Sequence, residues 1–149
     1  NIHRLYDLAR QTTRGFESYA KRLAKRYRNC PQILEDVLDG LFHIAAADEW
    51  DASRARGEYR ADSLGDEGFI HCSTLDQVLI PANERYHGRA DLLLLVIDPA
   101  RLAAALVYED CYETGQAFPH IYGPLNLDAV LRAVPFPPSA DGSFALPPL

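Results

Sequence analysis

The 149 residues are enough for one domain and a short appendage, and 48% of them are hydrophobic, as in chains with a buried core. The longest apolar run, residues 92–97, is too short to cross a bilayer, and the sequence has no signal-peptide pattern, so we expect a soluble, cytoplasmic protein. Three widely spaced cysteines fit neither a disulfide framework nor a zinc-finger pattern.

The net charge of -6 hides a division along the chain. Residues 1–30 hold eight Lys and Arg against two acidic residues, whereas the remainder holds seven against 19. Opposite charge in two parts of a chain predicts an appended segment. The basic part could contact nucleic acid, or it could lie on the acidic body of its own domain, which is the simpler expectation.

The first predicted element is a helix whose apolar residues form one stripe over residues 16–27. A second, short helix begins at Pro31 and ends at Gly40. We therefore predict a basic helical extension over residues 1–40. Its stripe must be buried on the main domain or on a partner chain, so the oligomeric state stays open.

Residues 41–149 form the predicted main domain, in which many short strands alternate irregularly with few helices. That pattern favours an α+β fold over a doubly wound one. The predicted helical segments are 48–57, 63–67 and 73–88, and the tail from residue 137 is expected to be irregular. The predicted strands are 41–44, 58–61, 69–72, 91–98, 105–113, 118–127 and 129–136.

Three of the five histidines are candidates for chemistry, because His43, His71 and His120 each sit in a short apolar strand. If these strands are neighbours, the three side chains could converge on one cleft. A metal site made by the three histidines is one alternative. The sequence shows no carboxylate obviously paired with them, so our favoured interpretation assigns no metal.

The stretch "GFIHCST" combines a histidine with a possible anion site. Side chains alternate along a strand, so His71 and Ser73 share one face while Ile70 and Cys72 share the other, which we assign to the core. Ser73 and Thr74 begin the predicted helix 73–88, whose first N–H groups could bind a phosphate. The simpler alternative is an N-cap without a ligand.

Long stretches of the main domain resemble the bacterial family named domain of unknown function 952, over about Leu41 to Phe136. The matching stretches are "LFHIAAADEWDASRARGEYRADSLGDEGFIHCST", "LLLLVIDPARL" and "FPHIYGPLNLDAV". The resemblance implies an ADP-ribosyltransferase-like fold, a small, strongly curved split β-sheet that binds nicotinamide adenine dinucleotide (NAD) in the gap. Within that superfamily the chain looks closest to members with a histidine in each of the first two motifs, which include RNA 2′-phosphotransferases.

Carried onto this sequence, the resemblance places the first motif at His43, the second at His71 and the third near His120. Many transferases have a glutamate in the third motif, and this chain has no acid there. The three histidines are thus the predicted catalytic residues. The predicted cofactor-binding residues are His43, His71, Ser73, Thr74, Tyr59, Arg85, Tyr86 and Tyr122.

Three functions follow as hypotheses. The first is an NAD-binding transferase of ADP-ribosyl or 2′-phosphotransferase type, with RNA or another nucleic acid as a partner of the basic helix and no membrane partner. The second is a nucleotide- or metabolite-binding module without catalysis, which the missing third-motif acid favours. The third is a histidine-coordinated metal-binding protein.

Overall fold

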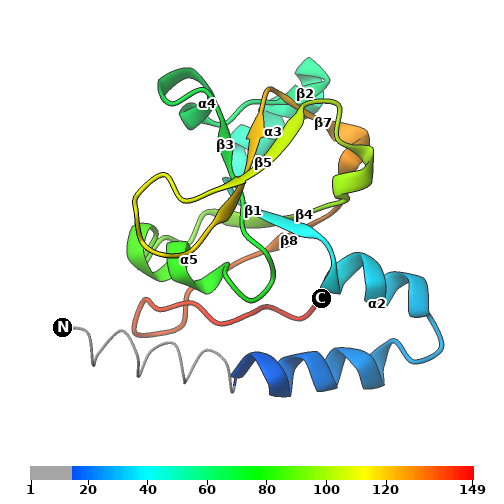
Figure 1. The fold of residues 1–149 in the computed structure, drawn as a ribbon. Coiled ribbons are helices and arrows are strands. Elements are labelled where there is room, and N and C mark those ends of the chain that lie inside the picture. Colours follow the sequence, from blue (N-terminus) through cyan, green and yellow to red (C-terminus); the bar gives the residue numbers. More distant parts are fainter. Residues whose placement is uncertain (1–14) are drawn as a thin grey trace.

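The computed structural model of the protein describes residues 15–149. Its strands form three small antiparallel sheets rather than one continuous sheet (Figure 1). The fold is therefore α+β, as the sequence pattern predicts. The first sheet is ordered β1 (Leu41–Ala46), β4 (Leu92–Ile97), β8 (Val130–Pro135); the second pairs β2 (Glu58–Tyr59) with β7 (Leu125–Asn126); and the third is ordered β3 (Ile70–His71), β6 (Phe118–Tyr122), β5 (Ala105–Glu109).

Two backbone hydrogen bonds connect the first sheet to the segment that follows β3. The N–H of Phe42 donates to the carbonyl of Ser73, and the N–H of Ser73 donates back to the carbonyl of Phe42, each at 2.8 Å. This bridge brings β1, which carries His43, beside β3, which carries His71.

The helices are short and lie between or after strands. They are the N-terminal helix over residues 15–26, α2 (Pro31–Leu38), α3 (Ala47–Arg56), α4 (Asp62–Asp66) and α5 (Leu79–Arg85), with short 3₁₀ turns at Pro99–Arg101 and Leu127–Ala129. The helix expected to begin near Asp48 is confirmed as α3. It ends at Gly57, which takes the left-handed conformation (φ +85°) that favours glycine at a helix C-terminus.

The long helix expected over residues 73–88 is wrong in its first part. Residues 75–78 form a turn, and α5 begins only at Leu79. Ser73 is still extended and paired with β1, and the side chain of Gln77 accepts from the N–H of Thr74 at 3.1 Å, which closes the turn. Pro81 has no N–H to donate to the carbonyl of Gln77, so the α-helical ladder does not extend upstream. Ser73 and Thr74 therefore do not begin α5, and the phosphate site expected there stays a prediction.

Strand β4 lies between two hydrophobic clusters. Leu92, Leu94 and Val96 belong to the cluster that the N-terminal helix covers. Leu95 and Ile97 belong to the other, together with residues of β2, β3 and β6. Alternate side chains of a strand point to opposite faces, so a strand buried on both faces has to be apolar throughout, as its sequence predicts.

The N-terminal helix packs on its own chain through apolar contacts. Tyr19 and Leu23 are buried in the same cluster as Phe144 and Leu149 of the tail. The Tyr19 hydroxyl also donates to the carbonyl of Pro147 at 2.6 Å. The stripe over residues 16–27 therefore docks within the chain, by apolar packing rather than by charge. The basic residues of the described helix and the turn after it face solvent: Lys21, Arg22, Lys25, Arg26 and Arg28.

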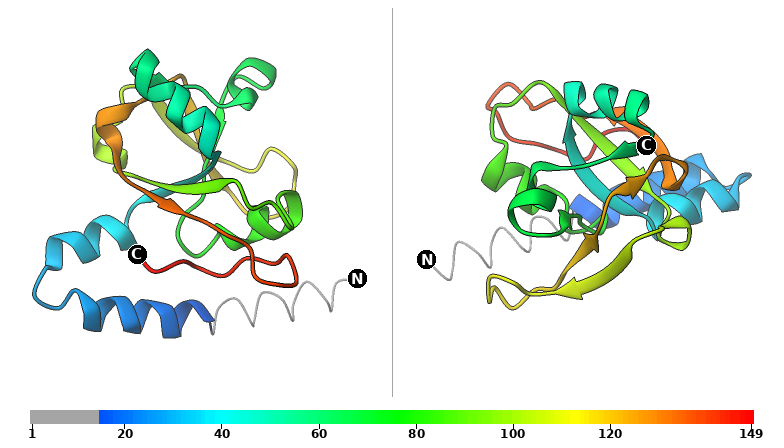
Figure 2. Two further views of the ribbon diagram at one scale, coloured as in Figure 1. Left: turned by 180° about the vertical axis from the view of Figure 1, so that it is seen from behind. Right: turned by 90° about the horizontal axis from the view of Figure 1, so that it is seen from above.

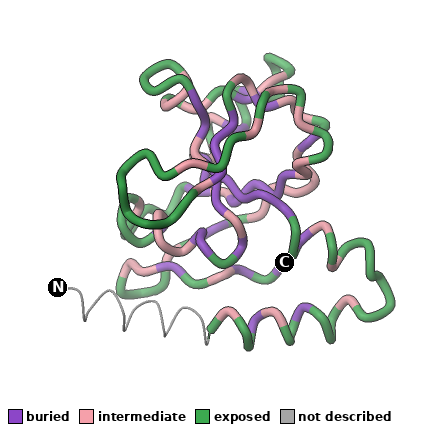
Figure 3. Tube along the Cα trace, viewed as in Figure 1, coloured by how far each residue is buried: buried purple, intermediate pink, exposed green. Residues whose placement is uncertain are grey.

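The tail from residue 137 has no helix or strand, as expected, but it is partly buried. It runs between the N-terminal helix and the first sheet (Figures 1 and 2). Figure 3 shows the buried positions gathered around the sheets, with the loop between β5 and β6 exposed. No helix in the described residues has the length and apolar character needed to cross a membrane.

Candidate functional site

His71 and His120 are directly opposite each other on neighbouring strands. They are register partners in the β3–β6 pair, and the centroids of their rings lie 5.2 Å apart. The ring of Phe69 stacks on His120 at 4.0 Å and meets His71 edge-on at 4.9 Å. The structure therefore brings two of the three predicted histidines together, on one face of the β3-β6-β5 sheet.

Each of these histidines is bonded to a glutamate. His71 Nε2 lies 3.0 Å from Glu67 Oε1, and His120 Nδ1 lies 2.8 Å from Glu109 Oε1. The hydrogen bond from His71 lowers the pKa of Glu67, and bonds from the Tyr122 hydroxyl and then from His120 lower the pKa of Glu109. The expectation that no carboxylate is paired with the histidines is therefore wrong.

His43 lies behind the pair. Its side chain is buried, and both ring nitrogens have partners inside the protein. Nδ1 bonds to the backbone carbonyl of His71, and Nε2 lies 2.8 Å from the Tyr59 hydroxyl. A carbonyl can only accept, so Nδ1 carries the hydrogen and Nε2 accepts from Tyr59. Burial lowers the pKa of His43 to about 4, so this imidazole is neutral near pH 7.

The other predicted cofactor ligands are dispersed. Ser73 is buried in the bridge to β1, Thr74 bonds to Asp76 in the following turn, and Tyr86 packs against the cluster under the N-terminal helix. Tyr59 is buried beside His43. The contacts of these four side chains lie elsewhere, so their cofactor-binding roles stay predictions.

Arg85 and Tyr122 reach the pair through other side chains. The Arg85 guanidinium lies over the ring of Tyr112 at 5.6 Å, and Tyr112 lies parallel to the ring of His71 at 6.4 Å. The Tyr112 hydroxyl donates to Glu67 at 3.0 Å. Tyr122 donates to Glu109, and this bond to a carboxylate raises the pKa of Tyr122 to about 12. Tyr112 and Tyr122 are large aromatic side chains that remain exposed.

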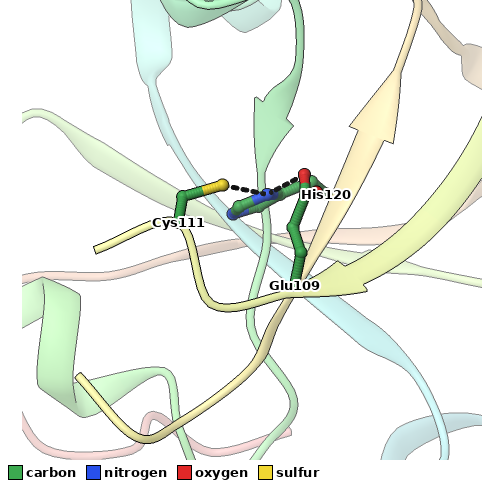
Figure 4. A group of neighbouring side chains, drawn as sticks. All are labelled: Glu109, Cys111 and His120. Atoms are coloured by element: carbon green, nitrogen blue, oxygen red, sulfur yellow. Dashed lines mark hydrogen bonds and ion pairs between the residues drawn. The ribbon is translucent and has the colours of Figure 1, made fainter. Parts of the chain in front are cut away.

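Cys111 joins the same group. Its Sγ lies 3.8 Å from His120 Nδ1, and Figure 4 shows Glu109, Cys111 and His120 directed toward one another. Desolvation, followed by the charge of Glu109, raises the pKa of the Cys111 thiol, so the thiol is not activated as a free nucleophile. Cys72, by contrast, is buried with Ile70, as the strand alternation predicts.

Glu67, Glu109, Cys111 and Tyr112 were not predicted as site residues. Glu67 stands four residues before His71, and this spacing was the one local signal that could have indicated a carboxylate beside a histidine. The alternation of β5 puts Glu109 on the face of Val107, but only the β5–β6 register, in which Val107 pairs with His120, directs that face to the site. Cys111 lies in the turn after β5, which strand alternation does not place.

Two hollows in the described part of the chain lie away from the histidines. One, of about 260 Å³, is lined by α2 and the residues after β4; the other, of about 310 Å³, lies between the N-terminal helix and the tail. Neither has a histidine in its lining. We place the candidate site at the histidine pair nevertheless, because that is where imidazoles, carboxylates and a thiol are in contact.

Known proteins match most of the main domain. The family described as "Protein of unknown function (DUF952)" matches residues 44–133. The crystal structure of protein CC0527 from Caulobacter crescentus is 34% identical with a TM-score of 0.64, over 71% of this chain and 93% of that chain. The solution NMR structure of CC0527 is 30% identical with a TM-score of 0.57, over 70% and 90%. No curated protein matches the chain. The family predicted from the motifs is thus confirmed, and the chain belongs to the DUF952 family.

Proposed function

We propose that the protein binds a nucleotide of the NAD class at the His71–His120 pair and acts as a transferase of ADP-ribosyl or 2′-phosphotransferase type. The observation that supports this most is the pairing itself: two imidazoles lie side by side on adjacent strands, each bonded to a glutamate. Paired groups of this kind can hold hydroxyls and phosphates and can exchange protons with them.

In this proposal His71 is the histidine that contacts the ligand first. Its side chain is 23% exposed, and Nε2 is bonded to Glu67, so Nδ1 is the nitrogen offered to a ribose hydroxyl or a phosphate oxygen. The exposed ring of Tyr112 offers a planar face to an adenine or nicotinamide ring, and Arg85 beside it supplies positive charge for a phosphate.

Glu109 supports the catalytic part of the proposal. Breaking the bond between nicotinamide and ribose develops positive charge on the ribose, which a nearby carboxylate stabilises. The third motif has no acid of its own, but Glu109 reaches His120 from the neighbouring strand. His43 acts as a positioning residue here, because its bond to the His71 carbonyl fixes the backbone of β3.

RNA is the acceptor that we propose for the transferred group. The exposed basic residues of the N-terminal helix supply the charge that a phosphate backbone requires. A 2′-phosphorylated RNA is therefore the first acceptor to test together with NAD.

Titration calorimetry on the full chain with NAD and with ADP-ribose tests the proposal. His71→Ala should weaken binding by about tenfold or more, the effect of losing one hydrogen bond to a charged group. His87→Ala is the matched control, because His87 is exposed and lies against Gly142, away from the pair. Absence of binding by the wild type would overturn the proposal, and unchanged binding by His71→Ala would overturn the site.

A nucleotide-binding module without catalysis is the second candidate. The burial of His120, which is only 2% exposed, favours this candidate. A catalytic acid or base has to reach its substrate, and a buried histidine does so less easily. NAD consumption, measured with and without the phosphorylated RNA, separates the two. Binding without consumption under either condition would identify a binding module.

A further inference from the structure

Three chemically different metal-ligating groups meet at the end of the β5–β6 hairpin. Glu109 is the last residue of β5, Cys111 follows two positions later, and His120 lies on β6. The register of the hairpin, in which Val107 pairs with His120, brings His120 to the face of Glu109, and the turn after β5 places Cys111 Sγ 3.8 Å from His120 Nδ1.

The potential donor atoms are already close enough to share one ion. The carboxylate of Glu109, Sγ of Cys111 and Nδ1 of His120 all lie within 4.8 Å of one another. His120 comes from the buried side, whereas Cys111 is exposed, so the group is open to solvent on one side. The turn that carries Cys111 is held by Asp110, whose carboxylate accepts from the N–H groups of Thr114 at 2.9 Å and Gly115 at 2.7 Å.

We propose that Glu109, Cys111 and His120 bind one transition-metal ion, with zinc as the best match. A thiolate and an imidazole together select zinc and related ions over the hard cations Mg²⁺ and Ca²⁺, and zinc accepts a carboxylate as third ligand. Three protein ligands leave the fourth tetrahedral position for water or a substrate atom, as in zinc sites with catalytic roles.

This ligand set differs from the three-histidine site considered from the sequence. His43 cannot join it, because both of its nitrogens are bonded within the protein. His71 Nε2 is bonded to Glu67 rather than to this group. The metal site shares Glu109 and His120 with the proposed nucleotide site. It nevertheless goes beyond the proposed function and does not require it, because it rests on the mutual distances of three ligand atoms, and Cys111 has no part in nucleotide binding.

Cobalt titration of the full chain, stripped of metal with a chelator, tests the site without any assay of activity. Co²⁺ should bind with a stoichiometry of one and produce the near-ultraviolet charge-transfer absorption of a thiolate–cobalt bond. Cys111→Ser should abolish that absorption. It should also weaken binding by more than the roughly 10–100-fold that loss of an outer partner of a metal ligand costs. His120→Ala should lose the site too.

Cys30→Ser is the matched control, since Cys30 is also an exposed, unbridged thiol but lies just before α2. This variant should keep the thiolate–cobalt absorption. Wild-type protein without that absorption, a Cys111→Ser variant that retains it or a Cys30→Ser variant that loses it would overturn the metal site. NAD titration of the wild type and of Cys111→Ser keeps the two proposals separate. If the wild type binds cobalt but no nucleotide, only the proposed function is refuted.

Discussion

His43 shows how a buried histidine can hold the backbone of a neighbouring strand. Its Nδ1–H holds the backbone carbonyl of His71, and its Nε2 accepts from Tyr59. These bonds fix one neutral tautomer inside the protein. A substitution at His43 is therefore expected to disturb the position of His71 through the backbone of β3.

Burial of a neutral histidine predicts a stability loss in acid. The pKa of His43 falls from 6.5 to about 4 on folding, chiefly through burial, so between these pH values the unfolded state binds the extra proton. Stability is complete above about pH 6.5 and falls as the pH drops through this window. The loss attributable to His43 is about 3 kcal/mol, taking about 1.4 kcal/mol per pKa unit. Denaturant unfolding at several pH values measures it.

His43→Asn provides the comparison. The asparagine does not titrate, so the variant should be less stable near pH 7 but should lose less stability between pH 6.5 and 4. Tyr59→Phe should keep most of the wild-type pH dependence, because burial rather than the hydroxyl is the main cause of the shift. Two titratable residues act on this ring: Tyr59 of β2 bonds to Nε2, and the charge of His71 on β3 lowers the pKa of His43 further. Equal pH profiles for wild type and His43→Asn would contradict the assignment.

At the scale of elements, α3 depends on the glycine that ends it. Gly57 has a φ of +85°, and a Cβ at this position would meet no atom within 4 Å. A side chain there would therefore lower stability through backbone strain alone and not through a steric clash. Gly57→Ala should therefore lower the free energy of unfolding by about 1–2 kcal/mol. Thermal unfolding compared with the wild type is the measurement.

Gly65 is the matched control for this prediction. It lies inside α4 and has room for a Cβ, as Gly57 has, but its φ is not positive. Gly65→Ala should be neutral or stabilise by up to about 1 kcal/mol, because alanine favours the helix and restricts the unfolded chain. If both variants lost stability equally, the left-handed conformation would not be the cause.

Local chemistry explains which elements were predictable. The apolar run of β4 and the glycine after α3 are signals carried by a few adjacent residues, and both elements form where expected. The segment 73–88 also carried helix signals in Thr74 and Gln77. There, pairing of Ser73 with β1 and the missing N–H of Pro81 prevailed over local propensity. The effect of Pro81 is local, and the sequence predicts that it kinks or restarts the helix. The pairing of Ser73 depends on a distant strand, so the sequence alone did not reveal it.

The candidate site shows the same limit more strongly. That His71 and His120 occupy strands was predictable, and so was the separation of His71 from the core face that holds Cys72. Their partners were not: Glu109 meets His120 only through the register of β5 with β6, which the turn over residues 110–117 sets. The turn depends on Asp110 accepting from backbone N–H groups, and no periodic pattern indicates such contacts.

At the scale of the whole molecule, the N-terminal helix and the tail form one layer over the first sheet. Leu23 of the helix and Phe144 of the tail share a cluster with β1 and β4, and the rings of Phe144 and Phe136 lie 4.9 Å apart. Neither segment pairs with a strand, so side-chain packing and a few hydrogen bonds hold both. These bonds include the one from the Tyr19 hydroxyl to the carbonyl of Pro147 and one from the N–H of Phe144 to Asn83 Oδ1 at 2.7 Å. We therefore expect them to open together, before the sheets unfold.

Phe144→Ala tests this coupling between the two ends of the described chain. Removing a ring that is only 5% exposed should cost about 3 kcal/mol or more. Because the layer opens as a unit, amide exchange should speed up in residues 15–26 as well as in the tail, whereas the amides of β4 should stay protected. Tyr108→Ala, on an exposed edge position with 55% exposure, is the control and should change stability by less than about 0.5 kcal/mol. Faster exchange confined to the tail would show that the helix is held independently. An equal increase in β4 would show that this layer and the sheets unfold as one cooperative unit.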